Sequence, residues 1–275
     1  MKSNITALII AKNEEQMIQA CLETLSFCQK IILVDNGSID KTTAIAENYN
    51  CQVISFSHES FAKLREKAQS MVETDWLLYI DADERITPAL AKEILLHVEK
   101  NDCEVMTISR KNICYGQRFL FGNWQNDLVT RVFKKENLLS WQGDIHESPI
   151  FKGNNINLQH ELIHLTHRNT QDNLRKSADW TIKEATALAA ASVKDVTFFT
   201  ILRKGVMEFY RRAIKFQGHK DGMAGIIEAL VQAINRMIVY IQVWELQQKP
   251  SIKAKYEKEE QEIKNLWQHE GKLRL

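Results

Sequence analysis

At the centre of the N-terminal half stands the segment Asp75-Trp76-Leu77-Leu78-Tyr79-Ile80-Asp81-Ala82-Asp83-Glu84-Arg85. The uninterrupted apolar run 76–80 has the length of a strand that is buried on both faces, as in the middle of a parallel sheet. Acidic residues follow it directly, at the point where open α/β sheets bind ligands. The segment therefore predicts a central strand with a polar site at its carboxyl end.

The two aspartates of this segment are candidates for metal binding. Asp81 and Asp83 are two residues apart, so both carboxylates point the same way if the extended backbone continues. Such a pair suits a hard cation, Mg²⁺ or Mn²⁺, that bridges a diphosphate. The alternative is a solvated acidic turn before a helix, because Thr87-Pro88 has the pattern of an N-cap followed by proline at the first helical position.

Strand and helix patterns alternate through residues 1–100. Buried strands are predicted at 6–11, 31–34 and 51–56, with helices after each of them, the last at 61–72. This alternation predicts βαβ units, a parallel sheet and one nucleotide-sized crevice at its carboxyl edge. An acid at a strand end is often only a cap or turn residue, which is the alternative for Glu14. The predicted strand ends carry Asn13 and Glu14, Asp35 and Asn36, and Asp81 and Asp83.

No glycine-rich phosphate cradle is present in the sequence. A dinucleotide site needs a glycine-rich turn after the first strand and a P-loop needs GxxxxGK[ST], and the chain has neither. A diphosphate would therefore be held by the metal pair, with Lys63 or Arg65 on the preceding helix as phosphate contacts. The alternative for Arg65 is an ordinary surface charge.

The next part of the chain supplies a candidate base. Strands are predicted at 104–110 and 128–135, followed by Trp141-Gln142-Gly143-Asp144-Ile145-His146-Glu147. The tryptophan offers an aromatic wall and the glycine a close backbone approach for a ligand. A carboxylate beside such a wall can be basic enough to take a proton from a hydroxyl, so Glu147 is the candidate general base. Alternatively, His146 and Glu147 only pair across a strand edge.

Composition limits the partners and the compartment. Lys and Arg number 36 against 35 acidic residues, so no overall field favours nucleic acid. The five cysteines form no CxxC pair, which favours reduced thiols, and we expect a cytoplasmic protein without a disulfide framework or zinc site. The N-terminal apolar run is too short for a signal peptide or a spanning helix.

Taken together, five motifs closely resemble the family 2 glycosyltransferases, nearest to the lipopolysaccharide-core glucosyltransferase-like branch. The resemblance covers residues 5–168 well and the rest more loosely. It implies a GT-A fold, that is, a Rossmann-like α/β mixed sheet, followed by a C-terminal amphipathic helical region. The motifs are 11–15 (AKNEE), 34–40 (VDNGSID), 81–84 (DADE), 131–133 (RVF) and 143–147 (GDIHE).

The resemblance also implies roles for individual residues. Asn13 and Glu14 would line the nucleotide pocket, and Asp35 would contact the base or ribose. Arg65 would reach the nucleotide or its phosphates, and Glu147 would be the catalytic base. The DxD pair would be Asp81, which also faces the nucleotide, and Asp83, which lies most directly on the metal, with His164 as a further metal contact.

The domain organisation follows from these motifs and from a change in pattern. We expect a GT-A domain at 1–170, with a nucleotide-sugar half at 1–100 and an acceptor half at 101–170, and a helical region at 171–275. Aromatic and basic residues interleave at helical spacing over 197–216, which is typical of a helix on an anionic membrane surface. A second apolar helix, 225–246, carries charges that make spanning a bilayer unfavourable. Packing on the protein's own domain or a homodimer contact is the alternative, and a charged, solvated helix is expected at 251–275.

These expectations combine into one functional hypothesis. The chain would move a hexose such as glucose from a UDP-sugar to a glycan or glycolipid acceptor such as the lipopolysaccharide core, with inversion and with Mg²⁺ or Mn²⁺. It would work in the cytoplasm, in peripheral contact with the inner face of the plasma membrane, and without nucleic acid. The alternatives are a non-catalytic sugar-nucleotide-binding or membrane scaffold protein and, with less support, a nucleotidyltransferase.

Overall fold

The computed structural model describes residues 4–58, 60–143, 147–191 and 193–270. The chain divides into two compact units, Met1–Asp172 and Asn173–Leu275. Within the described residues, all strands belong to the first unit, and the second unit is helical.

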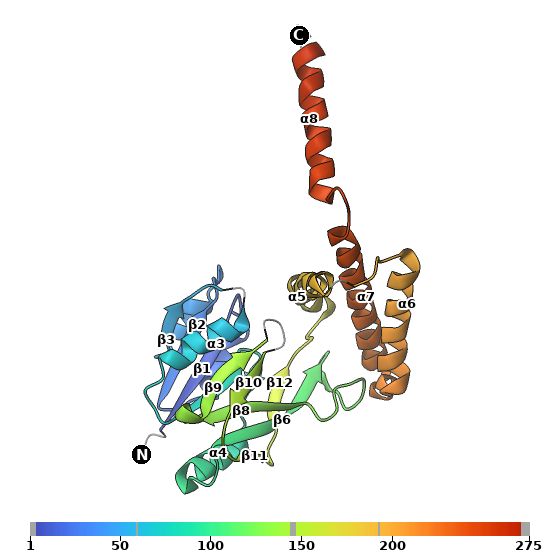
Figure 1. The fold of residues 1–275 in the computed structure, drawn as a ribbon. Helices are drawn as coiled ribbons and strands as arrows, with labels where there is room; N and C mark the ends of the chain where they lie inside the picture. The colour runs from blue at the N-terminus through green and yellow to red at the C-terminus, as the bar shows by residue number, and fades with distance from the viewer. Residues whose placement is uncertain (1–3, 59, 144–146, 192, 271–275) are drawn as a thin grey trace. The chain divides into compact units, whose positions relative to one another are not determined.

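A mixed sheet forms the centre of the first unit, in the order β3-β2-β1-β4-β8-β6-β12-β5 (Figure 1). β8 (Leu128–Lys134) runs antiparallel to both of its neighbours, β4 and β6 (Val105–Cys114). The βαβ pattern predicted a parallel sheet, which is correct only for the first half, because no crossover helix joins β6 to β8 and parallel neighbours need one. The parallel strands are β1 (Ile5–Ala11), β2 (Lys30–Asp35), β3 (Gln52–Ser55) and β4 (Trp76–Asp81).

Short strands complete the sheet beside the carboxyl end of β4. β12 (Leu162–Leu165) pairs with both β6 and β5 (Glu84–Arg85), and this pairing sets His164 opposite Glu84. The chain segment that follows the central strand is therefore joined to a strand about eighty residues later in the sequence. The remaining strands are β7 (Gln117–Arg118) and β11 (Asn155–Asn157), which pair with β6, and the separate pair β9 (Leu138–Gln142) and β10 (Ser148–Phe151).

Helices cover both faces of the sheet. The buried residues of α1, α2 and α4 pack in one core cluster and those of α3 in the other. α4 begins as the sequence predicted, because the Thr87 hydroxyl accepts a hydrogen bond from the Leu90 N–H at 3.2 Å and Pro88 occupies the first helical position. The helices are α1 (Ile18–Glu23), α2 (Thr42–Glu47), α3 (Phe61–Ser70) and α4 (Pro88–Lys100).

The central strand explains why the two faces form one domain. Leu78 and Ile80 lie in the core cluster on one face, and Leu77 and Tyr79 lie in the cluster on the other. Side chains alternate across a strand, so an uninterrupted apolar run fills both layers. The prediction that β4 is buried on both sides is confirmed.

The register of the parallel strands brings their carboxyl ends to one edge. Ile10 lies beside Asp81, and Ala11 lies beside Asp35. The chain leaves β1, β2 and β4 at the same level of the sheet, so the polar residues that follow these strands share one edge.

The second unit consists of helices that begin at the end of the first. The predicted helix over 197–216 is α6 (Phe198–Phe209) followed by a π-helical turn, η2 (Tyr210–Lys215), in which the Phe216 N–H donates to the Arg211 carbonyl at 2.8 Å. α8 is the charged, exposed helix expected near the C-terminus. The other elements are α5 (Thr170–Ala190), η3 (Gly218–Asp221), α7 (Gly222–Leu246) and α8 (Ile252–Glu270).

The turn into α7 requires glycine. A Cβ at Gly225 would lie 2.0 Å from the Gly218 carbonyl oxygen, so no larger residue fits at this approach of η3 to α7. By length and composition alone, the run Gly218–Leu246 could cross a membrane, although core helices of soluble proteins meet the same criterion.

A matched pair of neighbouring leucines tests the core that supports β4. Leu138 is 3% exposed and packs in the same cluster as Tyr79, whereas Leu139 is 56% exposed. We expect Leu138→Ala to lower the free energy of unfolding by about 2–5 kcal/mol and Leu139→Ala to change it by less than about 0.5 kcal/mol. Urea unfolding followed by tryptophan fluorescence measures both, and equal effects would contradict this packing.

Candidate active site

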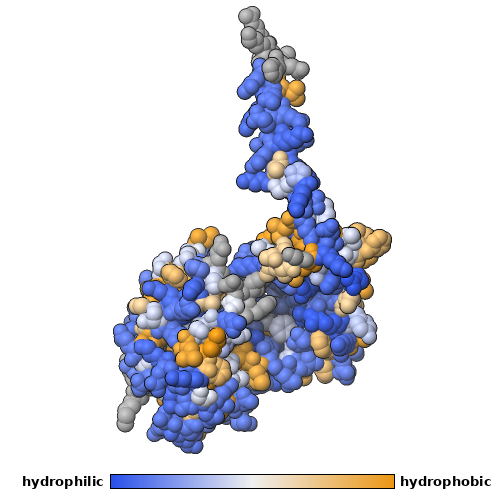
Figure 2. Space-filling model, in the orientation of Figure 1, coloured by the Kyte–Doolittle hydropathy of each residue, from blue (hydrophilic) through white to orange (hydrophobic). Residues whose placement is uncertain are grey.

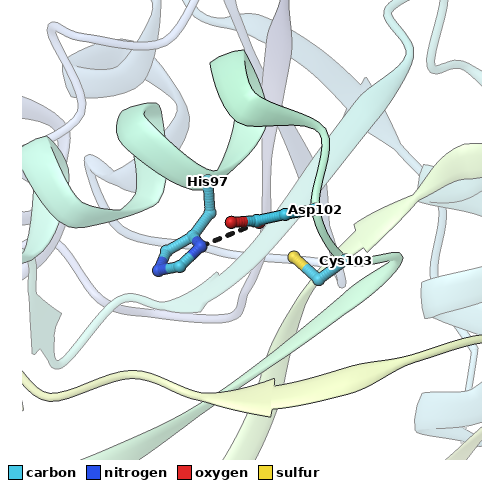
Figure 3. A group of neighbouring side chains, drawn as sticks. All are labelled: His97, Asp102 and Cys103. Atoms are coloured by element: carbon cyan, nitrogen blue, oxygen red, sulfur yellow. Dashed lines mark hydrogen bonds and ion pairs between the residues drawn. The ribbon is translucent and has the colours of Figure 1, made fainter.

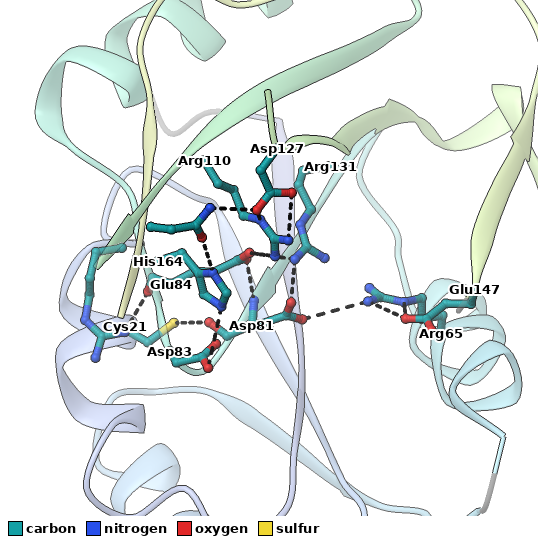
Figure 4. A network of polar contacts seen from close by, with 12 residues as sticks. Cys21, Arg65, Asp81, Asp83, Glu84, Arg110, Asp127, Arg131, Glu147 and His164 are labelled. Atoms are coloured by element: carbon teal, nitrogen blue, oxygen red, sulfur yellow. Dashed lines mark hydrogen bonds and ion pairs between the residues drawn. The ribbon is translucent and has the colours of Figure 1, made fainter. Parts of the chain in front are cut away.

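Asp81, the last residue of β4, is held by two guanidinium groups (Figure 4). Arg131, from the neighbouring strand β8, donates a hydrogen bond to its carboxylate, and Arg65, from α3, lies 3.8 Å from the other oxygen. Burial raises the pKa of Asp81, but the charges of Arg131 and Arg65 outweigh it and hold the pKa below its usual value. Asp81 is therefore an anion at neutral pH.

Glu84 completes a buried ion cluster with Arg131. Its side chain is 0% exposed, accepts a hydrogen bond from Arg131 at 2.6 Å and lies 3.4 Å from Arg110. Its other oxygen accepts the Asp81 backbone N–H at 2.9 Å, so Glu84 also fixes the turn that follows β4. Burial raises the pKa of Glu84, whereas Asp81 and Glu84 together raise the pKa of Arg131 against the opposing effect of burial.

This cluster is the part of the site that sequence reasoning assigned no role. The sequence patterns place Arg131 in the motif 131–133 and Glu84 in the motif 81–84, but they predict no contact between the two residues. The sequence contains one signal for this cluster, because Arg131 lies inside a predicted strand, directly before the apolar residues Val132 and Phe133. A charged residue inside such a strand needs a buried partner of opposite charge.

Asp83 and His164 face each other across the next turn. The His164 Nε2 lies 3.7 Å from an Asp83 carboxylate oxygen, and the side chains are 12% and 13% exposed. This distance exceeds that of a hydrogen bond. It lies between the separations of adjacent ligands, about 3 Å, and of opposite ligands, about 4 Å, around an octahedral ion with bonds of about 2 Å.

A relay behind His164 sets the state of its ring. Burial raises the pKa of Asp127, but hydrogen bonds and charge from Arg110 hold it below its usual value, so the carboxylate only accepts. Asn112 donates its amide to Asp127 at 2.8 Å, which turns the amide oxygen toward Nδ1 of His164 at 2.7 Å. Nδ1 then donates to Asn112, and Nε2 is the ring nitrogen that points at Asp83. Asp83 and His164 are therefore the candidate ligands for a cation at this point.

Arg65 links Asp81 to Glu147. Its guanidinium lies 2.8 Å from the Glu147 carboxylate and stacks over the rings of Trp141 at 4.6 Å and Tyr79 at 5.0 Å. The Tyr79 hydroxyl donates to the Arg65 carbonyl at 2.8 Å, so both ends of Arg65 are fixed. The alternative of an ordinary surface charge is wrong, since the residue is 7% exposed. Lys63 is instead an exposed residue that pairs with Glu66 at 2.8 Å.

The aromatic wall predicted beside Glu147 is present, but its function in the structure is to hold Arg65. Glu147 itself is 13% exposed and contacts Arg65 through Oε1. The alternative pairing of Glu147 with His146 lies outside the described residues.

The predicted nucleotide residues lie in the loops after β1 and β2. The Asn13 side-chain oxygen accepts the Ile39 N–H at 2.8 Å, and the Asp35 carboxylate accepts the Ser38 N–H at 3.2 Å. The Glu14 N–H donates to the Thr42 hydroxyl at 2.8 Å. The Asn13 and Glu14 contacts join the loop after β1 to the segment after β2, whereas Asp35, the last residue of β2, bonds within the turn that follows it.

A separate group of possible ligands occurs at the end of α4 (Figure 3). His97 lies 2.9 Å from Asp102, and the Cys103 thiol is next to them. Burial raises the pKa of Cys103 to about 11, so the thiol stays protonated and is a poor ligand. We interpret the group as the closing contact of α4, where Asn101 turns the chain in a left-handed conformation.

Carboxylates and guanidinium groups gather at the carboxyl edge of a partly parallel α/β sheet, which is the edge where sheets of this class bind their ligands. The chain belongs to glycosyl transferase family 2, because the model of that family matches residues 6–156, just over half of the sequence. The fold is accordingly GT-A, with the mixed sheet and helical C-terminal region that the resemblance implied.

The chain is also similar to individual proteins. The chain is similar to lipopolysaccharide core biosynthesis glycosyltransferase LpsC of Rhizobium meliloti, with 24% identity over 263 residues that cover 92% of this chain and 96% of that protein. An uncharacterized glycosyltransferase of Rickettsia felis is 36% identical over 91 residues, which are 33% of this chain and 32% of that protein. The solved structure of S. aureus TarS 1-349 in complex with UDP-GlcNAc has a TM-score of 0.46 and 14% identity, covering 90% of this chain and 92% of that one.

The contribution of Arg131 to stability can be measured by substitution. We expect Arg131→Met to lower the free energy of unfolding by about 3–5 kcal/mol, because Asp81 and Glu84 would lose their shared counter-charge. Arg118→Met is the control, since Arg118 is 43% exposed and pairs with Glu161 at the surface, where about 1 kcal/mol or less is expected. Denaturant unfolding measures both variants, and similar small changes would show that Arg131 is not the counter-charge of this site.

Proposed function

We propose that this protein is an inverting glycosyltransferase that moves a sugar, a hexose such as glucose, from a UDP-sugar to an acceptor hydroxyl. The observation that carries the proposal is the continuous chain of contacts from Glu147 through Arg65 to Asp81, beside the Asp83–His164 pair. It sets a candidate base, a cation for phosphate and a candidate metal site side by side at the ligand-binding edge of the sheet. Family membership supports the reaction type.

The residues present fit a divalent metal. Asp83 and His164 would hold it, with Asp81 beside them, and the relay through Asn112 presents the correct nitrogen lone pair for a metal ligand. A bound Mg²⁺ or Mn²⁺ would supply positive charge that stabilises the departing diphosphate. Carboxylate ligands suit both Mg²⁺ and Mn²⁺. The imidazole of His164 favours Mn²⁺, because Mg²⁺ binds oxygen ligands in preference to nitrogen.

Arg65 is suited to a phosphate and to the charge that develops on it. Its guanidinium is buried, fixed by two aromatic rings and directed at two carboxylates. Preorganised positive charge of this kind stabilises a leaving group without reorganisation during the reaction. Because Arg65 contacts both Asp81 and Glu147, it couples the donor side of the proposed site to the acceptor side.

Glu147 would accept the proton of the attacking hydroxyl. Its carboxylate lies 2.8 Å from the Arg65 guanidinium, which fixes the position of the proposed base. Attack on the anomeric carbon from the face opposite the diphosphate is a single displacement and inverts that centre. We further propose that Asn13, Glu14 and Asp35 line the nucleotide end of the pocket, where the chain leaves β1 and β2.

The proposed acceptor is a lipopolysaccharide core or another glycan or glycolipid. The similarity to LpsC along nearly the whole chain supports this choice. We place the reaction in the cytoplasm, which is supported by the five buried cysteines being free thiols. A non-catalytic sugar-nucleotide-binding protein is the second candidate, since the Glu147–Arg65 ion pair would also serve a structural purpose.

Glu147 is tested by removing its charge while keeping its shape. We expect Glu147→Gln to lower the rate of sugar transfer by about a hundredfold or more, the usual loss for a general base, with UDP binding unchanged. The assay measures UDP released from a panel of UDP-sugars with Mn²⁺ and acceptor, and Glu136→Gln is the control. Unchanged turnover in Glu147→Gln would remove this residue from the mechanism, and UDP-sugar binding by the parent without turnover would favour the non-catalytic protein.

The metal site is tested by calorimetry with Mn²⁺ and UDP. We expect Asp83→Asn and His164→Gln to abolish measurable Mn²⁺ binding. Asn112→Leu should weaken it by about tenfold or more, because the ring of His164 loses its orienting partner. His97→Gln is the matched control, since it alters the other group of possible ligands. Parent-like Mn²⁺ affinity in Asp83→Asn would contradict this site.

A further inference from the structure

The inner side of α7 combines an apolar core with polar contacts. Val239, Tyr240 and Val243 pack in one cluster with Ala185 of α5. Two polar groups of α7 also contact α5, since Asn235 donates to the Ser177 hydroxyl at 2.8 Å and the partly exposed Arg236 pairs with Glu184 at 2.5 Å. A helix on the surface of a water-soluble protein usually turns polar residues outward, whereas α7 also exposes many large apolar side chains, which suit an apolar environment.

Six of the eight exposed large apolar side chains of α7 lie in one stripe, and Ile226 and Leu246 are the other two. The six recur at intervals of three, four and seven residues, which places them on one face of the helix. We call them the α7 stripe: Met223, Ile227, Leu230, Ile234, Ile241 and Trp244, which are between 38% and 72% exposed.

The neighbouring helix α6 carries a second stripe of the same kind. Phe199, Leu202, Val206 and Tyr210 lie on one face, and Phe199 is 78% exposed. The two helices pack closely, since a Cβ at Gly205 would lie 2.5 Å from the Met237 side chain. In the view of Figure 2, hydrophobic residues show mainly at the upper end of these helices, among hydrophilic ones.

Positive charge borders the α6 stripe. Residues 198–220 contain six basic residues and one acid, in a chain whose net charge is only +1. The acid, Glu208, is 7% exposed and is bonded to Arg211 and Arg212, so it adds little negative charge to the surface. The basic residues are Arg203, Lys204, Arg211, Arg212, Lys215 and Lys220.

We propose that α6 and α7 dock together on the surface of an anionic lipid bilayer, with both stripes in the acyl boundary and the basic residues at the headgroups. Apolar area and attraction to acidic lipids are the two contributions that such binding needs. A two-fold contact between copies would set the same positively charged segment against itself, which opposes a dimer through this surface. The polar groups that α7 directs at α5 favour a position in the membrane plane over a span.

Vesicle co-sedimentation of the full chain tests this proposal without nucleotide or acceptor. We expect binding to phosphatidylcholine vesicles that contain about one third phosphatidylglycerol, and at least about tenfold weaker binding to phosphatidylcholine alone or in high salt. Arg203→Glu with Lys215→Glu should weaken binding to the acidic vesicles by about tenfold or more. Leu230→Ser with Ile234→Ser should weaken binding to both kinds of vesicle.

Matched controls come from α8, whose side chains are exposed to a similar or greater degree. Lys253→Glu with Lys258→Glu and Ile263→Ser with Leu266→Ser should bind as the parent does, because they alter charge and apolar surface outside the proposed surface. Parent protein that binds neither vesicle overturns the proposal. A second outcome also overturns the proposal: the parent is a dimer in sedimentation velocity, and Leu230→Ser with Ile234→Ser dissociates this dimer but leaves vesicle binding unchanged. Transfer to a soluble acceptor is measured separately, so failure of the docking proposal is distinguishable from failure of the proposed reaction.

Discussion

The candidate site depends on the placement of one buried guanidinium between two carboxylates. Arg131 bonds to Asp81 and Glu84 at the end of the central strand, where the chain turns toward β5. Removing the charges of Arg131 and Glu84 from water is costly, and this cost is offset by their direct bonds and by the Asp81 backbone N–H, which donates to Glu84. The antiparallel strand β8 is what delivers the arginine to this position, so the change of strand direction in the sheet and the polar site are parts of one arrangement.

Around this cluster the site has two branches that differ in chemistry. One runs from Asp127 through Asn112 to His164 and ends on Asp83, and its hydrogen bonds determine which nitrogen of the ring carries the proton. The other consists of Arg65, its aromatic neighbours and Glu147. The first branch presents electron pairs, as a metal site does, and the second presents positive charge and a carboxylate, as phosphate departure and proton removal require. Several of these side chains come from strands of the main sheet or from α3, whereas Asp83 lies in the turn after β4 and Glu147 directly precedes β10.

The second unit follows a different physical rule. In the first unit, apolar residues fill the two layers beside the sheet and charge collects at one edge. In α6 and α7, several charged and amide groups are instead paired inside the unit, and long apolar stripes remain outside. Apolar side chains on the outer face of such a helix are unfavourable in water. The basic residues beside them favour an anionic lipid surface as the partner. The contrast between the units fits a division of labour in which one carries the chemistry and the other a surface for docking.

The sequence by itself determined the alternation of strands and helices in the first half, the capped start of α4 and the residues at the strand ends, because apolar runs, turn residues and caps act over a few neighbouring positions. It also determined the family, through five motifs whose order and spacing are rarely met by chance. The direction of β8, the pairing of Glu84 and Arg110 with residues far along the chain, and the relay behind His164 were decided only by the tertiary structure. Their physical cause is long-range: a buried charge requires a partner, but local sequence contains no information on which distant strand brings that partner within hydrogen-bonding distance.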